Sequence, residues 1–267
     1  MFTESRSFFL VAGPCVLESE ALAFRIAASL QEVTSRLGIP FCFKASFDKA
    51  NRSSIGSYRG PGLAAGLEVL GRIREKLGIP VTTDVHESAQ AAPVAAVVDL
   101  LQIPAFLSRQ TDLLLAAAET GKPINVKKGQ FLAASDMDRI AEKLRSAGCP
   151  SFFFTERGTS FGYHDLVVDM RNLVQMRSRG HRVIFDATHS VQRPSALGSS
   201  SGGDRELAYP LARAAVAVGI DGLFLETHPT PEQSPSDGAT MIPLTQIPSV
   251  LERLLKIHEA AKDGDPA

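Results

Sequence analysis

The sequence predicts a (β/α)8 barrel, also called a TIM barrel, and three observations support this fold class. Eight short β-rich segments alternate with helical segments along the whole chain. Several of the β-rich segments are almost wholly apolar, as strands buried on both faces are. The length of 267 residues suits a barrel, which runs to about 250 residues as a single domain. We therefore expect one domain over residues 1–267, with its core at about 8–260.

The expected strands follow one another at the spacing of βα units. They are Phe8–Gly13, Pro40–Ser46, Val81–Val85, Leu100–Ala105, Pro123–Lys128, Ser151–Thr155, Arg182–Ala187 and Gly222–Glu226. The expected helices between them include Glu18–Leu37, Leu63–Leu77, Asp112–Thr120 and Met137–Ala147. Three of these helices lead into a Gly that suits a C-cap, at Gly38, Gly78 and Gly148, and a Pro within two residues then opens the next strand.

An open, doubly wound parallel sheet is the alternative fold. That fold usually carries a Gly-rich phosphate loop after its first strand. Here the first strand ends in Gly13-Pro14-Cys15, which is not G-x-G-x-x-G, and no break in composition marks a second domain. The barrel is therefore the favoured interpretation.

The composition excludes several classes of function. Lys and Arg number 28 and Asp and Glu number 29, whereas a general binder of nucleic acid or anionic membranes would carry a basic excess. No apolar run approaches the roughly 20 residues that span a bilayer, and the N-terminus lacks the features of a secretory signal. The three cysteines, Cys15, Cys42 and Cys149, form no C-x-x-C pair, which argues against a secreted disulfide framework. We expect a reduced, cytoplasmic protein.

Basic residues gather where the catalytic face of a barrel lies, at the C-terminal ends of the strands. They are Lys44, Lys49, Arg52, Arg59, Arg109, Lys127, Lys128 and Arg157. Lys and Arg that converge from several strands suit bound phosphate and carboxylate groups. Scattered surface charge is the alternative, but it does not explain why the second, fourth, fifth and sixth strands all end in cations.

A second set of side chains contains potential metal ligands. Cys15 closes the first strand, His189 the seventh and Glu226 the eighth, and Asp237 lies in the loop after the eighth. Barrel closure makes these three strands neighbours, so a thiolate, an imidazole and two carboxylates could meet around zinc, iron(II) or manganese. The alternative for Cys15 is a small buried hydrophobic residue.

Two further features of the sequence each allow two interpretations. Asp84 and His86 end the third strand and are candidates for proton transfer or water positioning, with a structural role as the alternative. The low-complexity stretch Ser195–Gly203 follows the seventh strand and is either a mobile lid or a plain flexible loop.

Several motifs together closely resemble the 3-deoxy-D-manno-octulosonate 8-phosphate synthase family. They are Gly13-Pro-Cys15, Lys44-Ala-Ser-Phe-Asp-Lys-Ala-Asn-Arg-Ser-Ser54, Gln102-Ile-Pro-Ala-Phe106, Arg109-Gln-Thr-Asp112, Asn125-Val-Lys-Lys128 and Asp186-Ala-Thr-His-Ser190. The resemblance runs from about residue 8 to residue 260. The segment Lys49–Ser54 separates this family from the related 3-deoxy-D-arabino-heptulosonate 7-phosphate synthases.

The resemblance implies a barrel enzyme, usually a homotetramer, that condenses phosphoenolpyruvate with D-arabinose 5-phosphate and releases inorganic phosphate. The product is a precursor of a lipopolysaccharide sugar. Binding of phosphoenolpyruvate is implied for Lys44, Lys49, Gln102, Ala105, Lys127 and Arg157. Binding of arabinose 5-phosphate is implied for Asn51, Arg52 and Ser53, with Arg59 in the following matched segment and Arg109 reaching in from a neighbouring subunit.

The family divides into a metal-dependent branch, with Cys at position 15, and a metal-independent branch with Asn there. This chain matches the first branch at Cys15, His189, Glu226 and Asp237, which implies one divalent metal ion per subunit. One departure is Gly56, where the family usually has His. The rival functions are a Schiff-base aldolase using Lys44 or Lys127, a metal-dependent aldolase and a non-catalytic sensor of phosphosugars.

Overall fold

Eight parallel strands close into a barrel in the computed structural model, which describes residues 8–52, 54–193 and 202–262. The barrel strands are β1 (Phe9–Gly13), β2 (Phe41–Lys44), β3 (Val81–Asp84), β4 (Leu100–Ile103), β5 (Ile124–Lys127), β6 (Phe152–Glu156), β9 (Val183–Asp186) and β12 (Gly222–His228). Closure is made by β1, which pairs with β2 on one side and with β12 on the other. The predicted fold class is confirmed, and the open sheet is excluded.

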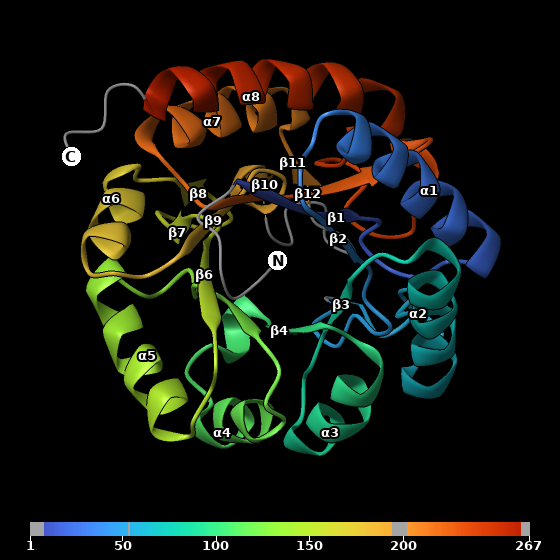
Figure 1. Ribbon diagram of the computed structural model, residues 1–267, viewed down its shortest axis with the longest axis horizontal. Helices are drawn as coiled ribbons and strands as arrows, with labels where there is room; N and C mark the ends of the chain where they lie inside the picture. Colours follow the sequence, from blue (N-terminus) through green and yellow to red (C-terminus); the bar gives the residue numbers. More distant parts are fainter. Residues whose placement is uncertain (1–7, 53, 194–201, 263–267) are drawn as a thin grey trace.

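Helices form a ring around the strands (Figure 1). They are α1 (Glu20–Arg36), α2 (Leu63–Leu77), α3 (Ser88–Val97), α4 (Thr111–Glu119), α5 (Met137–Ser146), α6 (Arg171–Ser178), α7 (Arg205–Val218) and α8 (Ile247–Lys262). The predicted C-cap at Gly78 is confirmed: its φ is 64°, and its N–H donates to Arg74 O. Gly adopts this left-handed conformation without a Cβ clash, so α2 ends where the sequence predicts. None of the helices in these residues has the length and apolar character needed to cross a membrane.

Short elements decorate the loops between strands and helices. The 3-10 turns are η1 (Ala105–Leu107), η2 (Ala134–Asp136), η3 (His189–Val191), η4 (Pro231–Gln233) and η5 (Leu244–Gln246). The short strands are β7 (Thr159–Ser160), β8 (Leu166–Val167), β10 (Gln192–Arg193), β11 (Gly202–Gly203) and β13 (Ile242–Pro243). These strands could not be predicted, since two residues carry no readable periodicity. In the stretch Ser195–Gly203, only β11 belongs to the described part of the chain, and the question of a lid lies outside it.

The interior of the barrel is divided into an apolar and a polar layer. The apolar layer consists of Phe9, Val11, Cys42, Leu100, Phe153, Ile184 and Phe224. Because side chains alternate along a strand, Lys44 shares a face with Cys42 but lies two residues nearer the C-terminal end of β2. The same step beyond the apolar residues of β4, β6, β9 and β12 leads to Gln102, Thr155, Asp186 and Glu226, near the C-terminal ends of these strands. This confirms that Cys42 belongs to the core.

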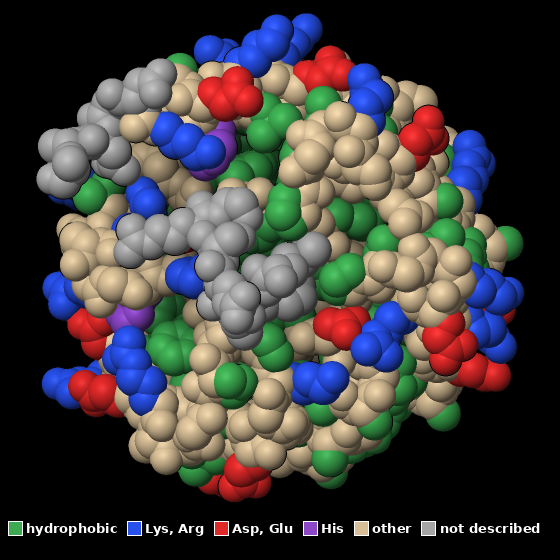
Figure 2. All heavy atoms as spheres, in the orientation of Figure 1, with side chains coloured by type: hydrophobic (Ala, Val, Ile, Leu, Met, Phe, Trp, Pro, Cys, Tyr) green, Lys and Arg blue, Asp and Glu red, His purple; other side chains and the backbone are tan. Residues whose placement is uncertain are grey.

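Charges on the outer surface are mixed in sign. On the face in view in Figure 2, Lys and Arg side chains are interspersed with Asp and Glu around the perimeter. This pattern agrees with the formal net charge of −1.

Candidate active site

A cavity of about 290 Å³ lies at the C-terminal ends of the barrel strands. Among its lining residues are these members of the predicted site: Lys44, Lys49, Asn51, Arg52, Asp84, His86, Gln102, Ala105, Lys127, Arg157, His189 and Asp237. Residues far apart in sequence therefore meet as the strand-end argument predicts. Cys15 and Glu226 are fully buried and join the site through contacts with these residues.

A chain of hydrogen bonds crosses four adjacent strands at the floor of the site. The Gln102 amide donates to Asp84 Oδ1 at 2.6 Å, and the Asn125 amide donates to Gln102 Oε1 at 2.9 Å. Thr155 Oγ1 donates to Asn125 Oδ1 at 2.6 Å. These buried groups satisfy one another's hydrogen-bonding capacity, so the Gln102 amide fixes the orientation of the Asp84 carboxylate. Burial alone would raise the pKa of Asp84, but Lys44 and Lys49 hold it well below its usual value.

Lys44 is a buried cation at the end of β2 whose partners are all protein groups. Its Nζ donates to Cys15 O at 3.2 Å, to Ser46 Oγ at 2.9 Å and to Glu226 Oε1 at 3.2 Å. Asp84 Oδ2 lies 3.6 Å away. A buried ammonium needs such compensation, and Lys44 consequently links the carboxylates of β3 and β12.

Lys127 extends from β5 over the ring of Phe224, 3.2 Å from its centroid. Its Nζ donates to the buried carboxylate of Asp186 at the end of β9. Burial lowers the pKa of Lys127, although the nearby carboxylate opposes this shift. Burial would raise the pKa of Asp186, but His189 and Lys127 together outweigh burial and lower it.

Two cations offer hydrogen-bond donors that no other described residue uses. Arg157 is buried after β6, and its Nη1 has no partner, while Nη2 donates to Gln192 Oε1 at 2.9 Å. The Lys49 side chain lines the cavity and has no ion pair or hydrogen bond within the described part of the chain. Burial opposes the charge of Lys49, but the acidic groups of Cys15, Glu226 and Asp84 raise its pKa. These free donors suit an anionic ligand.

Four potential metal ligands converge on one side of the cavity, and we call Cys15, His189, Glu226 and Asp237 the acidic corner. Cys15 Sγ lies 3.3 Å from Asp237 Oδ2. His189 Nε2 lies 3.6 Å from Glu226 Oε2 and 3.8 Å from Asp237 Oδ2. Sulfur and one carboxylate oxygen each from Glu226 and Asp237 lie within 4.8 Å of one another. The predicted convergence of strands β1, β9 and β12 is confirmed.

The acidic corner fits a divalent cation in its chemistry. Glu226 Oε2 is buried and has no hydrogen-bond partner among the described residues, which leaves a carboxylate oxygen facing the other donors. Burial alone would raise the pKa of Glu226, but His189, Lys44 and Lys49 lower it to about 2, so it is ionised. Burial, and then Glu226, raise the pKa of the Cys15 thiol, and a cation between the donors would reverse this by stabilising the thiolate.

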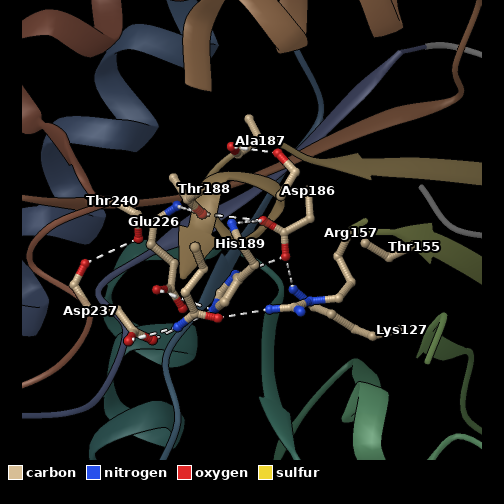
Figure 3. A network of polar contacts seen from close by, with 12 residues as sticks. Lys127, Thr155, Arg157, Asp186, Ala187, Thr188, His189, Glu226, Asp237 and Thr240 are labelled. Carbon is tan, nitrogen blue, oxygen red and sulfur yellow. Dashed lines mark hydrogen bonds and ion pairs between the residues drawn. The ribbon is translucent and has the colours of Figure 1, made fainter. Parts of the chain in front are cut away.

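The backbone and the surroundings of the acidic corner orient its ligands. Asp186 Oδ2 lies 2.8 Å from His189 Nδ1, so Nε2 is the nitrogen that faces the carboxylates (Figure 3). A carboxylate behind a His ligand is a common arrangement at metal sites. Asp237 has a φ of 51°, which is uncommon for a residue other than Gly and aims its side chain inward from the loop after β12.

The predicted residues carried by loops are less well assembled than those at the strand ends. Asn51 and Arg52 line the cavity, but the Arg52 guanidinium donates to two backbone carbonyls, Tyr58 O and Pro235 O, at 3.0 and 3.4 Å. Arg59 is exposed and forms an ion pair with Asp48 instead of lining the cavity. Ser53 lies outside the described residues.

Two further cations of the predicted rim lie away from this cavity. Arg109 follows η1 and does not line the cavity of its own chain. Its predicted action across a subunit interface stays a prediction. Lys128 is fully buried, with its Nζ 3.0 Å from Leu132 O and 3.5 Å from Glu156 Oε2, so it has a structural role.

Four polar residues of the site were not among the predicted site residues: Asn125, Gln130, Asp186 and Gln192. Gln130 and Gln192 line the cavity, and Asn125 and Asp186 support residues that do. Asn125 and Asp186 lie near predicted strand ends and belong to two of the motifs that carry the family resemblance, but no role was predicted for them. No pattern in the sequence marks the two glutamines.

Comparison with known proteins gives a consistent result. The profile of the DAHP synthetase I family matches residues 3–263. A protein from Cyanothece, named 2-dehydro-3-deoxyphosphooctonate aldolase, is 58% identical over 96% of this chain and 94% of its own. Proteins of the same name from Bordetella petrii and Fusobacterium nucleatum are 56% and 52% identical, over 96% and 98% of this chain and 92% and 94% of their own.

Proposed function

The chain belongs to the DAHP synthetase I family, and on that premise we propose that it is a 3-deoxy-8-phosphooctulonate synthase. It condenses phosphoenolpyruvate with D-arabinose 5-phosphate and water, giving 3-deoxy-D-manno-octulosonate 8-phosphate and inorganic phosphate, a step toward lipopolysaccharide. The relatives named above carry the name of this activity. The observation that carries the proposal is one cavity lined by Arg157, whose buried Nη1 has no partner, by Lys49, and by His189 and Asp237 of the acidic corner.

The cations of the cavity take the two anionic groups of phosphoenolpyruvate. Arg157 presents a planar guanidinium with a free Nη1, which matches a phosphate or carboxylate edge. Lys49 supplies a second charge without an ion pair in the described residues, and Lys127 lies beside Asp186. Gln102 and the backbone of Ala105 complete this subsite.

Arabinose 5-phosphate occupies the outer part of the cavity, which the loop residues Asn51 and Arg52 line. Ser53 and Arg59 belong to the same loop. The phosphate end of the sugar then points toward the rim, where Arg109 of a neighbouring subunit binds it. A phosphosugar with five carbons is the expected acceptor because the Lys49–Ser54 segment matches the family that uses it.

The reaction needs close control of negative charge. The C3 carbon of phosphoenolpyruvate attacks the sugar aldehyde while water adds at C2, and phosphate leaves by C–O cleavage. Lys44, Lys49 and Arg157 stabilise the charge that develops on the carboxylate and phosphate oxygens. Asp84 and His86 position water or move protons: burial lowers the pKa of His86, which favours the neutral ring that can accept a proton.

One divalent metal ion, such as zinc, iron(II) or manganese, is proposed for the acidic corner. Cys15, Glu226 and Asp237 would hold it, since one donor atom from each lies within 4.8 Å of the others, and His189 would complete the set through its Nε2 beside the two carboxylates. The unpartnered Glu226 Oε2 supports this assignment. When bound, the ion supplies a Lewis acid that orients the aldehyde or activates water. Asp186 holds His189 in place, because the His189 backbone N–H donates to Asp186 Oδ1 at 2.9 Å and Oδ2 lies 2.8 Å from the ring Nδ1.

Assembly as a homotetramer in the cytoplasm belongs to the same proposal. Arg109 lies outside its own cavity, and Phe106 in the neighbouring η1 turn is 52% exposed although it lines the cavity. Both features suit a rim that a second subunit completes. The described cysteines are unpaired, which suits a reducing compartment.

The decisive experiment measures phosphate release with the two substrates together and with each alone. Phosphate should appear in equal amount with a ketosugar acid only when both are present, and erythrose 4-phosphate should be a poor substitute. A pyruvate aldolase would release no phosphate.

One observation favours a Schiff-base aldolase as the second candidate function, namely the lowered pKa of Lys127. Such an enzyme would be trapped irreversibly by borohydride in the presence of a carbonyl substrate. The proposed synthase should show no such adduct.

A further inference from the structure

Gln192 connects the two sides of the cavity through a single amide group. Its Nε2 donates to Asp237 Oδ1 at 2.9 Å, and its Oε1 accepts from Arg157 Nη2, also at 2.9 Å. Arg157 and Asp237 lie on opposite sides of His189 in Figure 3. One side chain thus touches both the guanidinium proposed for phosphoenolpyruvate and a carboxylate of the acidic corner.

The orientation of this amide is fixed by its partners. A carboxylate needs a donor and a guanidinium needs an acceptor, so turning the amide over would place like against like at both ends. The backbone fixes the position of the residue too: Gln192 ends the η3 turn that begins at His189, and its N–H donates to His189 O. Gln192 then pairs with Gly203 of β11.

Gln192 binds one atom of Asp237 and one of Arg157, and in each case it leaves the atom that would bind a ligand free. With Oδ1 held by Gln192, Asp237 turns Oδ2 toward Cys15 and His189, at 3.3 and 3.8 Å. With Nη2 held by the same amide, Arg157 directs the unpartnered Nη1 to a ligand. We infer that Gln192 is a positioning residue that couples metal binding at the acidic corner to anion binding at Arg157. This inference rests on the proposed function.

Metal binding and anion binding would be coupled through the freedom of three side chains. A metal ion that fixes Asp237 also fixes the Gln192 amide, and a fixed amide holds Arg157 ready for an anion without further loss of side-chain freedom. By linkage, the factor by which the metal tightens anion binding equals the factor by which the anion tightens metal binding. A side chain without hydrogen-bonding groups should weaken both sites and reduce this factor.

The test compares the wild-type protein with Gln192→Met, which keeps the length of the side chain and removes both hydrogen bonds. Cobalt(II) is titrated into metal-free protein, and the thiolate-to-cobalt absorption reports ligation by Cys15. Phosphoenolpyruvate binding to metal-free and cobalt-loaded protein is measured by calorimetry. In the variant we expect both dissociation constants to rise about 10-fold or more, as for the loss of a hydrogen bond to a charged group.

A matched control is Gln31→Met, which removes an amide contact with Leu77 O between α1 and α2, away from the cavity. It should leave both dissociation constants unchanged. Gln192→Asn keeps the amide but is one methylene too short to reach both partners. It should therefore bind cobalt(II), phosphoenolpyruvate or both less tightly. It also serves if Gln192→Met does not fold.

The outcomes separate the inference from the proposed function. Wild-type protein that binds neither cobalt(II) nor phosphoenolpyruvate would overturn the function itself. Wild-type binding of both, with unchanged constants in the Gln192 variants, would overturn only the role of Gln192. If Gln192→Met weakened the binding of only one of the two ligands, the residue would serve one site and would not couple the two.

Discussion

Residues at the strand ends and residues on the loops differ in how completely the fold places them. Lys44, Glu226 and Asp186 are buried and bonded to other site residues, because each lies on a barrel strand whose pairing fixes its backbone. Arg52 and Arg59 lie on the long β2 loop and bond to carbonyls or to Asp48 instead. The difference indicates that the barrel fixes the strand-end residues in place. Under the proposed function, the sugar phosphate and a second subunit would complete the outer part of the site.

Cys15→Ser should produce the largest loss, because it removes the sulfur that would bind the metal ion as a thiolate in the acidic corner. A neutral hydroxyl is a poor metal ligand, so metal content after gel filtration should fall sharply and turnover should drop by more than about 100-fold. Metal analysis and phosphate release measure the two effects. Retention of wild-type metal and activity would return Cys15 to the role of a buried apolar thiol.

Cys15→Asn sharpens this prediction, since Asn occupies position 15 in the metal-independent branch of the resembled family. If the cations carry most of the catalysis, this variant should keep some activity without metal. If the metal is the main electrophile, it should be inactive.

Arg157→Met should have the next largest effect, because the buried guanidinium supplies a donor where negative charge develops. We expect kcat/KM for phosphoenolpyruvate to fall about 100- to 1000-fold, as when one donor to a developing anion is removed. Steady-state kinetics with either substrate varied measures this effect. If only the KM for arabinose 5-phosphate changed, Arg157 would bind the sugar phosphate and not phosphoenolpyruvate, contrary to the proposal.

Arg109→Ala tests the loop side of the comparison. It should raise the KM for arabinose 5-phosphate about 10- to 150-fold, the cost of a charge-assisted hydrogen bond, and change that for phosphoenolpyruvate less. Mixing this variant with an inactive Cys15→Ser chain should restore activity in hybrid oligomers. Hybrids without activity would mean that Arg109 acts within its own subunit.

Arg59→Ala should have the smallest effect. Ion pairs at the surface, such as this one with Asp48, contribute little to stability, so the thermal midpoint should hardly move and turnover should change less than about fivefold. A loss as large as that of Arg109→Ala would show that Arg59 leaves Asp48 to bind the sugar phosphate. Thermal unfolding separates a loss of stability from a loss of binding.

The sequence predicted the barrel and the meeting of the strand-end residues because both follow from periodicity and closure. Cys15 and Glu226 are 211 positions apart, yet β1 and β12 had to be neighbours in a closed sheet. Pairing of side chains was not predictable in the same way. Nothing in the pattern indicates that Arg59 binds Asp48, that Lys128 faces Glu156 or that Gln192 bridges Arg157 and Asp237. Such pairings depend on local backbone geometry and side-chain length rather than on alternation.

The most direct test of the account is phosphate release by exhaustively chelated protein, supplied with both substrates, before and after adding manganese, cobalt or iron(II). The acidic corner predicts that chelation abolishes release, that a divalent ion restores it, and that one metal ion is recovered per active chain. Full activity in chelated protein with no metal detectable by elemental analysis would contradict the account.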